Sequence, residues 1–209
     1  MKAFIIANGE ICDYDFTRMV LADGDHILAC DGGLHHCHAM GVLPDYIIGD
    51  MDSVDGSLLY EYRESNIIRF DPVKNQTDLE LAIARTCELN VDSIVILGGL
   101  GGRVDHQLGN VHAMAQAVEN NVRAEMWDEH TRVMLINDYC RLQRGDGVLV
   151  TLLPLTTTAE GIVTEGLKYP LKNESLTVGL ARGISNEIAN DEARITLKSG
   201  LLLVIQTKR

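Results

Sequence analysis

The sequence has few of the features that mark secreted, membrane or nucleic-acid-binding proteins. Its five cysteines are odd in number and include no CxxC pair, so neither a disulfide framework nor a zinc ribbon is predicted. Lys and Arg number 18 against 30 Asp and Glu, and the net charge of -12 disfavours binding to nucleic acid or anionic membranes. No apolar run approaches the roughly 20 residues of a membrane span, and the run over residues 3–7 is too short for a signal peptide. We therefore expect a cytoplasmic protein that binds neither nucleic acid nor membrane.

What is present is an ordinary globular composition. Of the 209 residues, 46% are hydrophobic and 23% are charged, which is enough apolar material for one large core or two small ones. An acidic chain binds a phosphate substrate only with local help from a divalent cation, a helix N-terminus or single arginines. The composition therefore permits metal-nucleotide chemistry.

Residues 1–136 alternate short apolar runs with amphipathic stretches. The apolar runs, each expected to be a buried strand, are residues 4–7, 26–30, 46–48, 67–70 and 93–97. The amphipathic stretches, each expected to be a helix, are residues 14–21, 33–40, 57–64, 77–89 and 104–120. This alternation predicts an α/β domain with an open, mostly parallel sheet and helices on both faces, and it places ligands at the carboxyl ends of the strands.

Residues 137–209 follow a different pattern, with short β-type runs, frequent turn signals and no helical period. The runs expected to be strands are residues 148–155, 162–167, 176–180, 193–197 and 201–207. We expect a small antiparallel β-sandwich domain of about 70 residues. The boundary between the two domains is placed between residues 136 and 137.

Three aspartates follow predicted strands at the ligand-binding edge of the sheet. Asp50 and Asp52 lie directly after the strand at 46–48, and Asp78 lies at the start of the helix at 77–89. Carboxylate oxygens there suit Mg²⁺ bound together with substrate phosphates. Each segment alone is also typical of a helix N-terminus, with Asp52 or Ser53 as the cap in the first segment and Thr77 or Asn75 as the cap of the helix at 77–89. The shared edge favours a metal site formed by Asp50, Asp52 and Asp78.

Glycines are concentrated after the strand at 93–97. The segment Gly98-Gly99-Leu100-Gly101-Gly102-Arg103 opens a helix and offers backbone N–H groups and a guanidinium to an anion, although it matches neither GxxxxGK[ST] nor GxGxxG. The segment Asp31-Gly32-Gly33 repeats the strand-to-helix geometry, but its glycines are equally typical of a tight turn. We interpret the first segment as an anion-binding loop.

In the second domain, polar and aromatic residues gather at 165–171 and 182–187. Tyr169 offers a flat face to a heteroaromatic ring, and Ser185 and Asn186 offer hydrogen bonds to ring nitrogens and amino groups. Turns and edge strands have a similar composition, so these residues alone do not establish a ligand site.

Taken together and in order, these segments resemble the thiamine pyrophosphokinase family over nearly the whole chain. The motifs that carry the resemblance are Asp31-Gly32-Gly33, Pro44-Asp45, Gly49-Asp50-Met51-Asp52-Ser53, Gln76-Thr77-Asp78, Gly98-Gly99-Leu100-Gly101-Gly102-Arg103-Val104-Asp105, Gly166-Leu167-Lys168-Tyr169 and Ser185-Asn186. The resemblance implies a homodimer that transfers the pyrophosphoryl group of ATP to the hydroxyl of thiamine and releases AMP. It also implies a thiamine site between the sandwich of one subunit and the α/β domain of the other.

The resemblance further assigns roles to individual residues. Asp50, Asp52 and Asp78 would hold Mg²⁺, and Arg103 would stabilise the charge of the triphosphate. The residues that would line the ATP site are Asp31, Gly32, Gly33, Gln76, Thr77, Gly99, Gly101, Gly102 and Asp105. Tyr169 would stack on the thiamine pyrimidine, where some relatives carry Trp, and Ser185 and Asn186 would hydrogen-bond to it. The alcohol proton would go to Asp78 or Asp105, or positioning alone would suffice.

Three alternatives remain open on these residues. A pyrophosphokinase acting on hydroxymethyl-dihydropterin would use a similar acidic triad, but the predicted sandwich argues against it. A non-catalytic thiamine or nucleotide sensor would tolerate the loss of acids, and all three are present here. A metal-dependent phosphohydrolase would release inorganic phosphate rather than AMP.

Overall fold

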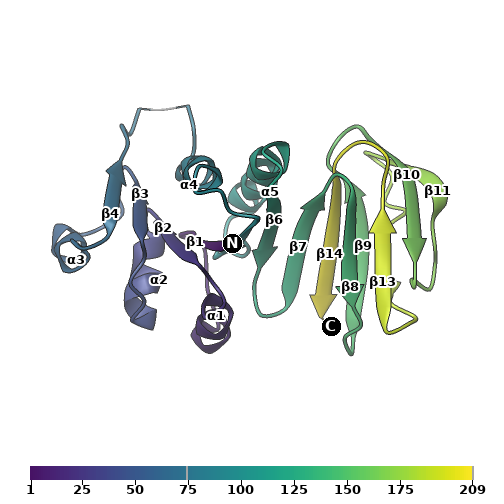
Figure 1. Ribbon diagram of the computed structural model, residues 1–209, viewed down its shortest axis with the longest axis horizontal. Coiled ribbons are helices and arrows are strands. Elements are labelled where there is room, and N and C mark those ends of the chain that lie inside the picture. Colours follow the sequence, from purple (N-terminus) through teal and green to yellow (C-terminus); the bar gives the residue numbers. More distant parts are fainter. Residues whose placement is uncertain (74, 209) are drawn as a thin grey trace. The chain divides into compact units, whose positions relative to one another are not determined.

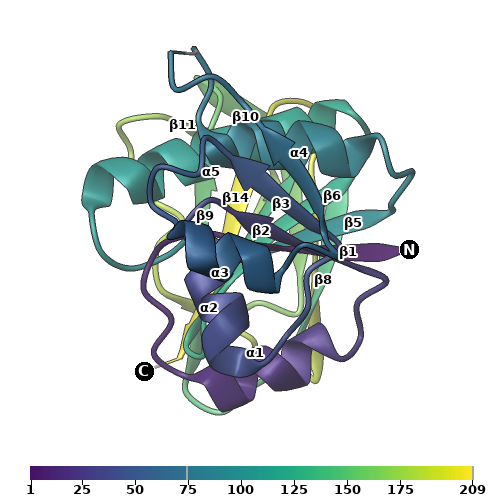
Figure 2. The same cartoon turned by 90° about the vertical axis from the view of Figure 1, so that its left-hand side faces the viewer.

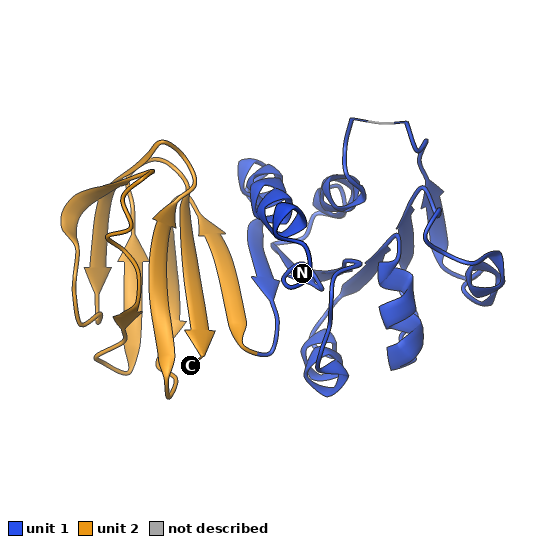
Figure 3. Ribbon diagram, turned by 180° about the vertical axis from the view of Figure 1, so that it is seen from behind, with its two compact units in different colours: residues 1–129 blue, residues 130–209 orange. Residues whose placement is uncertain are grey.

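The computed structural model describes residues 1–73 and 75–208. The chain forms two compact units, Met1–Glu129 and His130–Arg209 (Figure 3). The strand β7 (Thr131–Ile136) pairs with β14 (Leu202–Lys208), so the division falls before β7 rather than after it. In the part of the chain that the structure describes, every helix is too short or too polar to cross a membrane.

The first unit is built on a parallel sheet, as the sequence predicts. Its strands are β1 (Lys2–Ile6), β2 (His26–Cys30), β3 (Tyr46–Gly49), β4 (Asn66–Arg69), β5 (Ser93–Leu97) and β6 (Arg123–Trp127). They lie in the order β6-β5-β1-β2-β3-β4, and each neighbouring pair is parallel. The order reverses between β1 and β5, and such a switch point leaves a crevice at the carboxyl ends of the two strands.

Helices cover both faces of this sheet, which confirms the predicted open α/β architecture (Figures 1 and 2). One face carries α1 (Tyr14–Leu21) and α2 (Gly33–Met40), and the other carries α4 (Asp78–Cys87) and α5 (Val104–Glu119). The short helix α3 (Gly56–Glu61) lies near β4 at the edge of the sheet.

Local capping explains where several of these helices begin and end. The side chain of Asp13 accepts the N–H of Phe16 at the start of α1, and Thr77 and Glu80 form a capping box at the start of α4. Helix α2 ends at Gly41, whose φ of 67° is left-handed and therefore suits glycine. Helices α1 and α2 occupy the residues predicted for them.

Two strands of the first unit differ from the sequence-based expectation. The run at 67–70 is expected to be buried, yet β4 is mostly exposed because it is the edge strand and pairs only with β3 among the described strands. Strand β6 is not predicted, although Ala124 and Met126 are buried and alternate with more exposed neighbours. That alternation is the period of two expected for a strand with one buried face.

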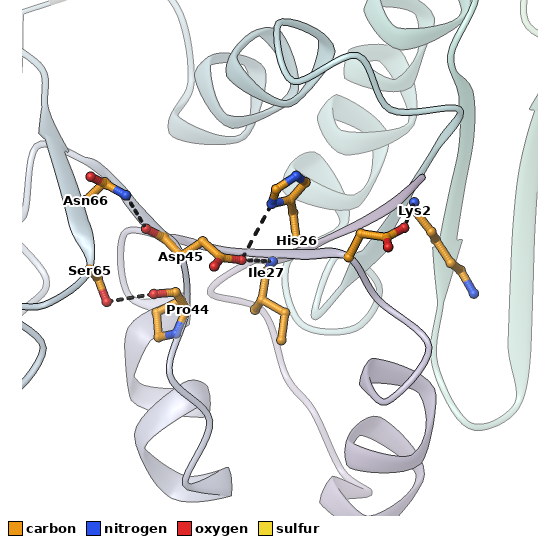
Figure 4. Close-up of polar contacts among 8 residues, drawn as sticks. Lys2, His26, Ile27, Pro44, Asp45, Ser65 and Asn66 are labelled. Carbon is orange, nitrogen blue, oxygen red and sulfur yellow. Dashed lines mark hydrogen bonds and ion pairs between the residues drawn. The ribbon is translucent and has the colours of Figure 1, made fainter.

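Polar side chains connect the amino ends of the strands, at the edge of the sheet away from the predicted site (Figure 4). The carboxylate of Asp45 accepts the N–H of Ile27 at 2.8 Å, and its main-chain carbonyl accepts from the Asn66 amide at 3.1 Å. The hydroxyl of Ser65 donates to the carbonyl of Pro44 at 2.6 Å. The Pro44-Asp45 motif therefore links β2, β3 and β4 at the edge opposite the strand carboxyl ends.

The second unit is a sandwich of two antiparallel sheets, as predicted, in the orders β12-β9-β14-β7 and β11-β10-β13-β8. Its remaining strands are β8 (Tyr139–Gln143), β9 (Val148–Pro154), β10 (Thr158–Glu165), β11 (Lys172–Thr177), β12 (Asn186–Glu187) and β13 (Glu192–Thr196). Buried side chains from both sheets, including Leu142, Val150, Ile162 and Ile195, form a single core. Burial between two faces is what holds such a sandwich together.

Candidate functional site

Three aspartates meet at the carboxyl ends of β2 and β3 and at the start of α4. One carboxylate oxygen each from Asp31, Asp50 and Asp78 lies within 4.8 Å of the other two. The sequence predicts Asp50 and Asp78 as metal ligands and Asp31 as a contact of ATP. The structure therefore brings two of the three predicted ligands together and adds Asp31 to them.

The burial of Asp31 marks this cluster as more than a patch of acidic surface. Only 8% of Asp31 is exposed, and its Oδ1 atom is buried with no hydrogen-bond partner among the described residues. A buried carboxylate oxygen with no partner is unfavourable, and more so beside two further carboxylates, unless a cation binds there. The backbone of Asp31 also has a left-handed φ of 45°, which is uncommon outside glycine.

The spacing of the three carboxylates fits a divalent cation with oxygen ligands. Two oxygens bound to one Mg²⁺ ion lie no more than about 4.2 Å apart. The oxygens of Asp31, Asp50 and Asp78 lie within 4.8 Å of one another, so small side-chain movements would bring all three onto one ion. The donor set is therefore of the kind that Mg²⁺ prefers.

Asp52 lies outside this cluster, although it is expected within it. Its side chain is exposed, its Oδ1 accepts the hydroxyl of Ser53 at 2.9 Å, and its N–H donates to the Asp50 carboxylate at 3.1 Å. Met51, between the two acids, has a left-handed φ of 65° and a buried side chain. The loop therefore turns at the buried Met51, and this turn directs the carboxylates of Asp50 and Asp52 to different places. The metal role of Asp52 stays a prediction.

The glycine loop after β5 is held by the helix that follows it. Gly98, Gly101 and Gly102 have positive φ angles of 67°, 85° and 70°, so the loop path requires glycine at these points. The Asn110 amide donates to the Gly99 carbonyl at 2.9 Å, and the Gln107 amide donates to the Gly102 carbonyl at 3.3 Å. Helix α5 thus fixes the orientation of peptide groups in the loop.

The loop after β1 forms the other side of the switch point and is not among the site segments predicted from the sequence. The N–H of Gly9 donates to the Gly98 carbonyl at 2.9 Å, and a Cβ on Gly9 would lie only 2.3 Å from that oxygen. The Asn8 amide lies over Gly32, where a Cβ would be 2.3 Å from its Oδ1. An Asn-Gly pair directly after a buried strand is a turn signal that would have pointed to this loop.

The predicted ATP residues Gly32, Gly33, Gln76 and Thr77 lie on the same edge with different local roles. A Cβ on Gly33 would lie 1.9 Å from the Ile6 carbonyl, so the close approach of β1 requires glycine there. In the capping box, the Thr77 hydroxyl accepts the Glu80 N–H at 3.2 Å and the Glu80 carboxylate accepts the Thr77 N–H at 2.7 Å. Gln76 is exposed. Contact of these residues with a nucleotide stays a prediction.

Arg103 and Asp105 form an exposed ion pair at the start of α5. The guanidinium donates from Nε to Oδ1 at 3.1 Å and from Nη2 to Oδ2 at 2.6 Å. These hydrogen bonds from Arg103 lower the pKa of Asp105 to about 2. A carboxylate held in this state is a weak base, so its geometry suits orientation of Arg103 better than proton removal.

The two polar segments of the second unit lie together. The N–H of Lys168 donates to the Glu187 carbonyl at 2.9 Å, and Tyr169 and Ser185 are both exposed. The Asn186 amide donates to the Tyr169 carbonyl at 2.8 Å and accepts the Tyr169 N–H at 3.1 Å. Asn186 therefore fixes the backbone that carries the Tyr169 ring, whereas its amide is predicted from the sequence to bind a ligand.

Comparison with known proteins gives consistent matches over both units. Residues 17–126 match the family model described as the thiamin pyrophosphokinase catalytic domain, and residues 139–202 match the thiamin pyrophosphokinase vitamin B1 binding domain. A thiamine pyrophosphokinase of Bacillus subtilis is 28% identical over 176 residues, which is 80% of each chain. A thiamine pyrophosphokinase of Arabidopsis thaliana is 29% identical over 188 residues, covering 79% of this chain and 66% of that protein.

Solved structures share the fold. The crystal structure of thiamine pyrophosphokinase from Bacillus subtilis matches with a TM-score of 0.88 at 23% identity, covering 100% of both chains. Thiamin pyrophosphokinase from Candida albicans matches with a TM-score of 0.82 at 18% identity, covering 99% of this chain and 89% of that one. At these identities the likeness supports the two-part architecture alone.

Proposed function

This chain belongs to the thiamin pyrophosphokinase family, and from that premise we propose that it transfers the pyrophosphoryl group of ATP to thiamine. The products are thiamine diphosphate and AMP. The observation that carries the proposal is that catalytic-domain and vitamin B1 binding-domain matches follow one another in this one chain. A pterin acceptor is not favoured, because a vitamin B1 binding domain matches the second unit.

We assign the magnesium site to Asp31, Asp50 and Asp78. The unpartnered Oδ1 of Asp31 and the mutual approach of the three carboxylates support this assignment. Asp52, which is predicted as a ligand, lies outside the cluster, and its backbone N–H donates to the Asp50 carboxylate. Held by these carboxylates, Mg²⁺ would neutralise charge on the triphosphate and on the oxygen that leaves with AMP.

The triphosphate then extends from this cluster toward the glycine loop. Backbone groups of Gly99, Gly101 and Gly102 and the Arg103 guanidinium supply positive potential, and Asp105 orients Arg103. Asp31-Gly32-Gly33 together with Gln76 and Thr77 border the nucleotide. Preorganised donors of this kind act mainly by stabilising charge and by positioning.

In the transfer, the thiamine hydroxyl oxygen bonds to the β-phosphorus as the bond from that phosphorus to the α,β-bridging oxygen breaks. The bridging oxygen leaves with the electron pair as part of AMP, and the hydroxyl proton passes to Asp78 or to water. Asp78 is favoured over Asp105 in this role, because hydrogen bonds from Arg103 lower the pKa of Asp105 to about 2 and so make it a weak base.

Thiamine binding is assigned to the second unit. The exposed ring of Tyr169 stacks on the pyrimidine, Ser185 hydrogen-bonds to the pyrimidine, and Asn186 contributes by holding the Tyr169 backbone.

We also propose a cytoplasmic homodimer. Exposed apolar side chains of Val178, Leu180 and Ile184 are available for a subunit contact.

Product analysis tests this proposal. Purified protein with Mg²⁺, ATP and thiamine is expected to form AMP and thiamine diphosphate in equal amounts, as measured by mass spectrometry. Formation of ADP or free phosphate instead would refute pyrophosphoryl transfer. Hydroxymethyl-dihydropterin offered in place of thiamine is expected to remain unmodified.

A further inference from the structure

His36 lies in α2 and contacts two neighbouring segments through its two ring nitrogens. Its Nε2 lies 2.8 Å from the carbonyl oxygen of Gly9, and its Nδ1 lies 2.8 Å from the hydroxyl of Tyr14 in α1. A carbonyl oxygen only accepts hydrogen bonds, so Nε2 carries the proton and donates to Gly9. In the neutral ring Nδ1 then accepts from Tyr14, and burial lowers the pKa of His36, which favours that neutral form.

The Gly9 peptide that His36 holds is in direct contact with the glycine loop. Its N–H donates to the Gly98 carbonyl, and neither Gly9 nor Gly98 has room for a Cβ. A Cβ on Gly98 would lie 2.6 Å from the carbonyl of Ala7. The two loops at the switch point therefore pack backbone against backbone, and a shift of Gly9 is transmitted to Gly98.

Helix α2 also begins at the carboxylate cluster. Its first residue, Gly33, follows directly after Asp31 and Gly32, and His36 lies one turn further along the same helix. One rigid helix thus connects the proposed cation site at its start with the Gly9 peptide through His36.

We propose that His36 is a positioning residue for the ATP triphosphate. It fixes the Gly9 peptide, through it the start of the glycine loop at Gly98, and so the spacing between that loop and the aspartate cluster. The inference rests on the proposed function, because it takes the glycine loop as the triphosphate site. Both ring nitrogens are occupied by protein partners, so His36 acts without touching the substrate.

The alternative is that His36 only stabilises the fold. That role would lower the melting temperature of a variant and reduce the active fraction, with no selective effect on ATP. A positioning role changes the affinity for ATP and leaves the affinity for thiamine, which we assign to the second unit, unchanged.

The test compares His36→Leu, which loses both hydrogen bonds, with His36→Gln, whose amide retains a donor and an acceptor. The dissociation constant of Mg-ATP without thiamine is measured by calorimetry, alongside KM for each substrate, kcat and the melting temperature. His36→Leu is expected to weaken ATP binding about tenfold and to change the KM for thiamine by no more than about twofold. His36→Gln is expected to recover most of the lost ATP affinity.

His38→Leu is the matched control. His38 lies on the same helix but is exposed and contacts Glu61 and Tyr62 at the end of α3, so ATP binding is expected to be unchanged. A folded His36→Leu protein with the ATP affinity of the unmodified protein would overturn the proposal, as would equal changes for both substrates. If His36→Leu does not fold, Tyr14→Phe takes its place. It is expected to weaken ATP binding about threefold, and unchanged binding would overturn the proposal.

The binding measurement also separates this inference from the proposed function. An unmodified protein that forms no thiamine diphosphate would refute the proposed reaction. The Mg-ATP affinities of the His36 variants would still report whether His36 positions the nucleotide.

Discussion

Gly49 and Asp31 lie so close together that a Cβ on residue 49 would be 3.0 Å from the Cβ of Asp31. Because Gly49 ends β3 and Asp31 follows β2, this contact is made between two adjacent strands at the edge where the aspartates meet. The absence of a side chain at residue 49 leaves the space in which Asp31 reaches Asp50 and Asp78.

Gly49→Ala is therefore expected to displace Asp31 and to weaken Mg²⁺ binding about tenfold, since a shift of one ligand removes most of its contribution. Calorimetric titration of the nucleotide-free protein with Mg²⁺ measures the effect. Gly56→Ala is the control, because no heavy atom of the described residues lies within 4 Å of its Cβ position. Equal Mg²⁺ affinity of both variants would show that the space beside Asp31 is unimportant.

Asp31→Asn tests the composition of the metal site. Asparagine tolerates the left-handed φ of 45° at this position, so the fold is expected to be kept. Mg²⁺ should raise the melting temperature of the unmodified protein by several degrees, because it binds only the folded state. This shift is expected to be lost in Asp31→Asn, and differential scanning calorimetry measures it.

Asp52→Asn is the matched comparison, because Asp52 is a neighbouring acid outside the cluster. It is expected to retain most of the Mg²⁺-induced shift. If the shift were instead lost in Asp52→Asn and kept in Asp31→Asn, the metal ligands would be Asp50, Asp52 and Asp78, as predicted from the sequence.

The sequence predicts the architecture well because long-range periodicity reports burial. Buried apolar runs identify the central strands β1, β2, β3 and β5, and the loss of helical period after residue 137 identifies the sandwich. The sequence predicts a strand less well where only one face of that strand is buried. The alternating residues of β6 illustrate this, since a half-buried strand of five residues carries a weak signal.

The sequence also predicts the edge of the sheet at which the acidic cluster lies, but not which side chains meet there. Parallel strands bring their carboxyl ends to one edge whatever the loop sequences are. Whether Asp52 and Asp31 join Asp50 depends on the left-handed backbone conformations of Met51 and of Asp31 itself, which spacing along the sequence does not reveal. The Asn186 amide likewise has a local backbone partner in Tyr169 that residue type does not predict.

Tyr169→Ala is expected to raise the KM for thiamine about tenfold, from loss of an aromatic contact of about 1 to 1.5 kcal/mol. Asn186→Ala should also raise the KM for thiamine, by a smaller factor, because the substitution releases the backbone that carries the Tyr169 ring. If Asn186 acts through Tyr169, the double variant should be no worse than Tyr169→Ala alone.

Steady-state kinetics on the three variants measures these effects, and Tyr139→Ala serves as the control. Tyr139 is also an exposed aromatic of the second unit, 43% exposed, but it lies outside the predicted site. Fully additive effects of Tyr169→Ala and Asn186→Ala would show that Asn186 contacts thiamine independently.

The Arg103–Asp105 pair makes a prediction about pH. Hydrogen bonds from Arg103 lower the pKa of Asp105 from an ordinary value of 3.8 to about 2. Because this carboxyl pKa is lowered in the folded state, the ion pair stabilises the folded protein at pH values above the ordinary pKa. That stabilisation is lost as the pH falls through about 2. Between about pH 5 and about pH 9 the pair is intact, so it should not contribute to the acid limb of activity.

Asp105→Asn removes the charge that orients Arg103 while keeping the size of the side chain. The KM for ATP is expected to rise about three- to tenfold, because charge-assisted hydrogen bonds to Arg103 are lost. The apparent pKa of the acid limb of kcat/KM is expected to be the same as in the unmodified protein. Measurement of kcat/KM against pH for both proteins tests this, and a shifted acid limb in Asp105→Asn would mean that Asp105 titrates in the working range and is available as a base.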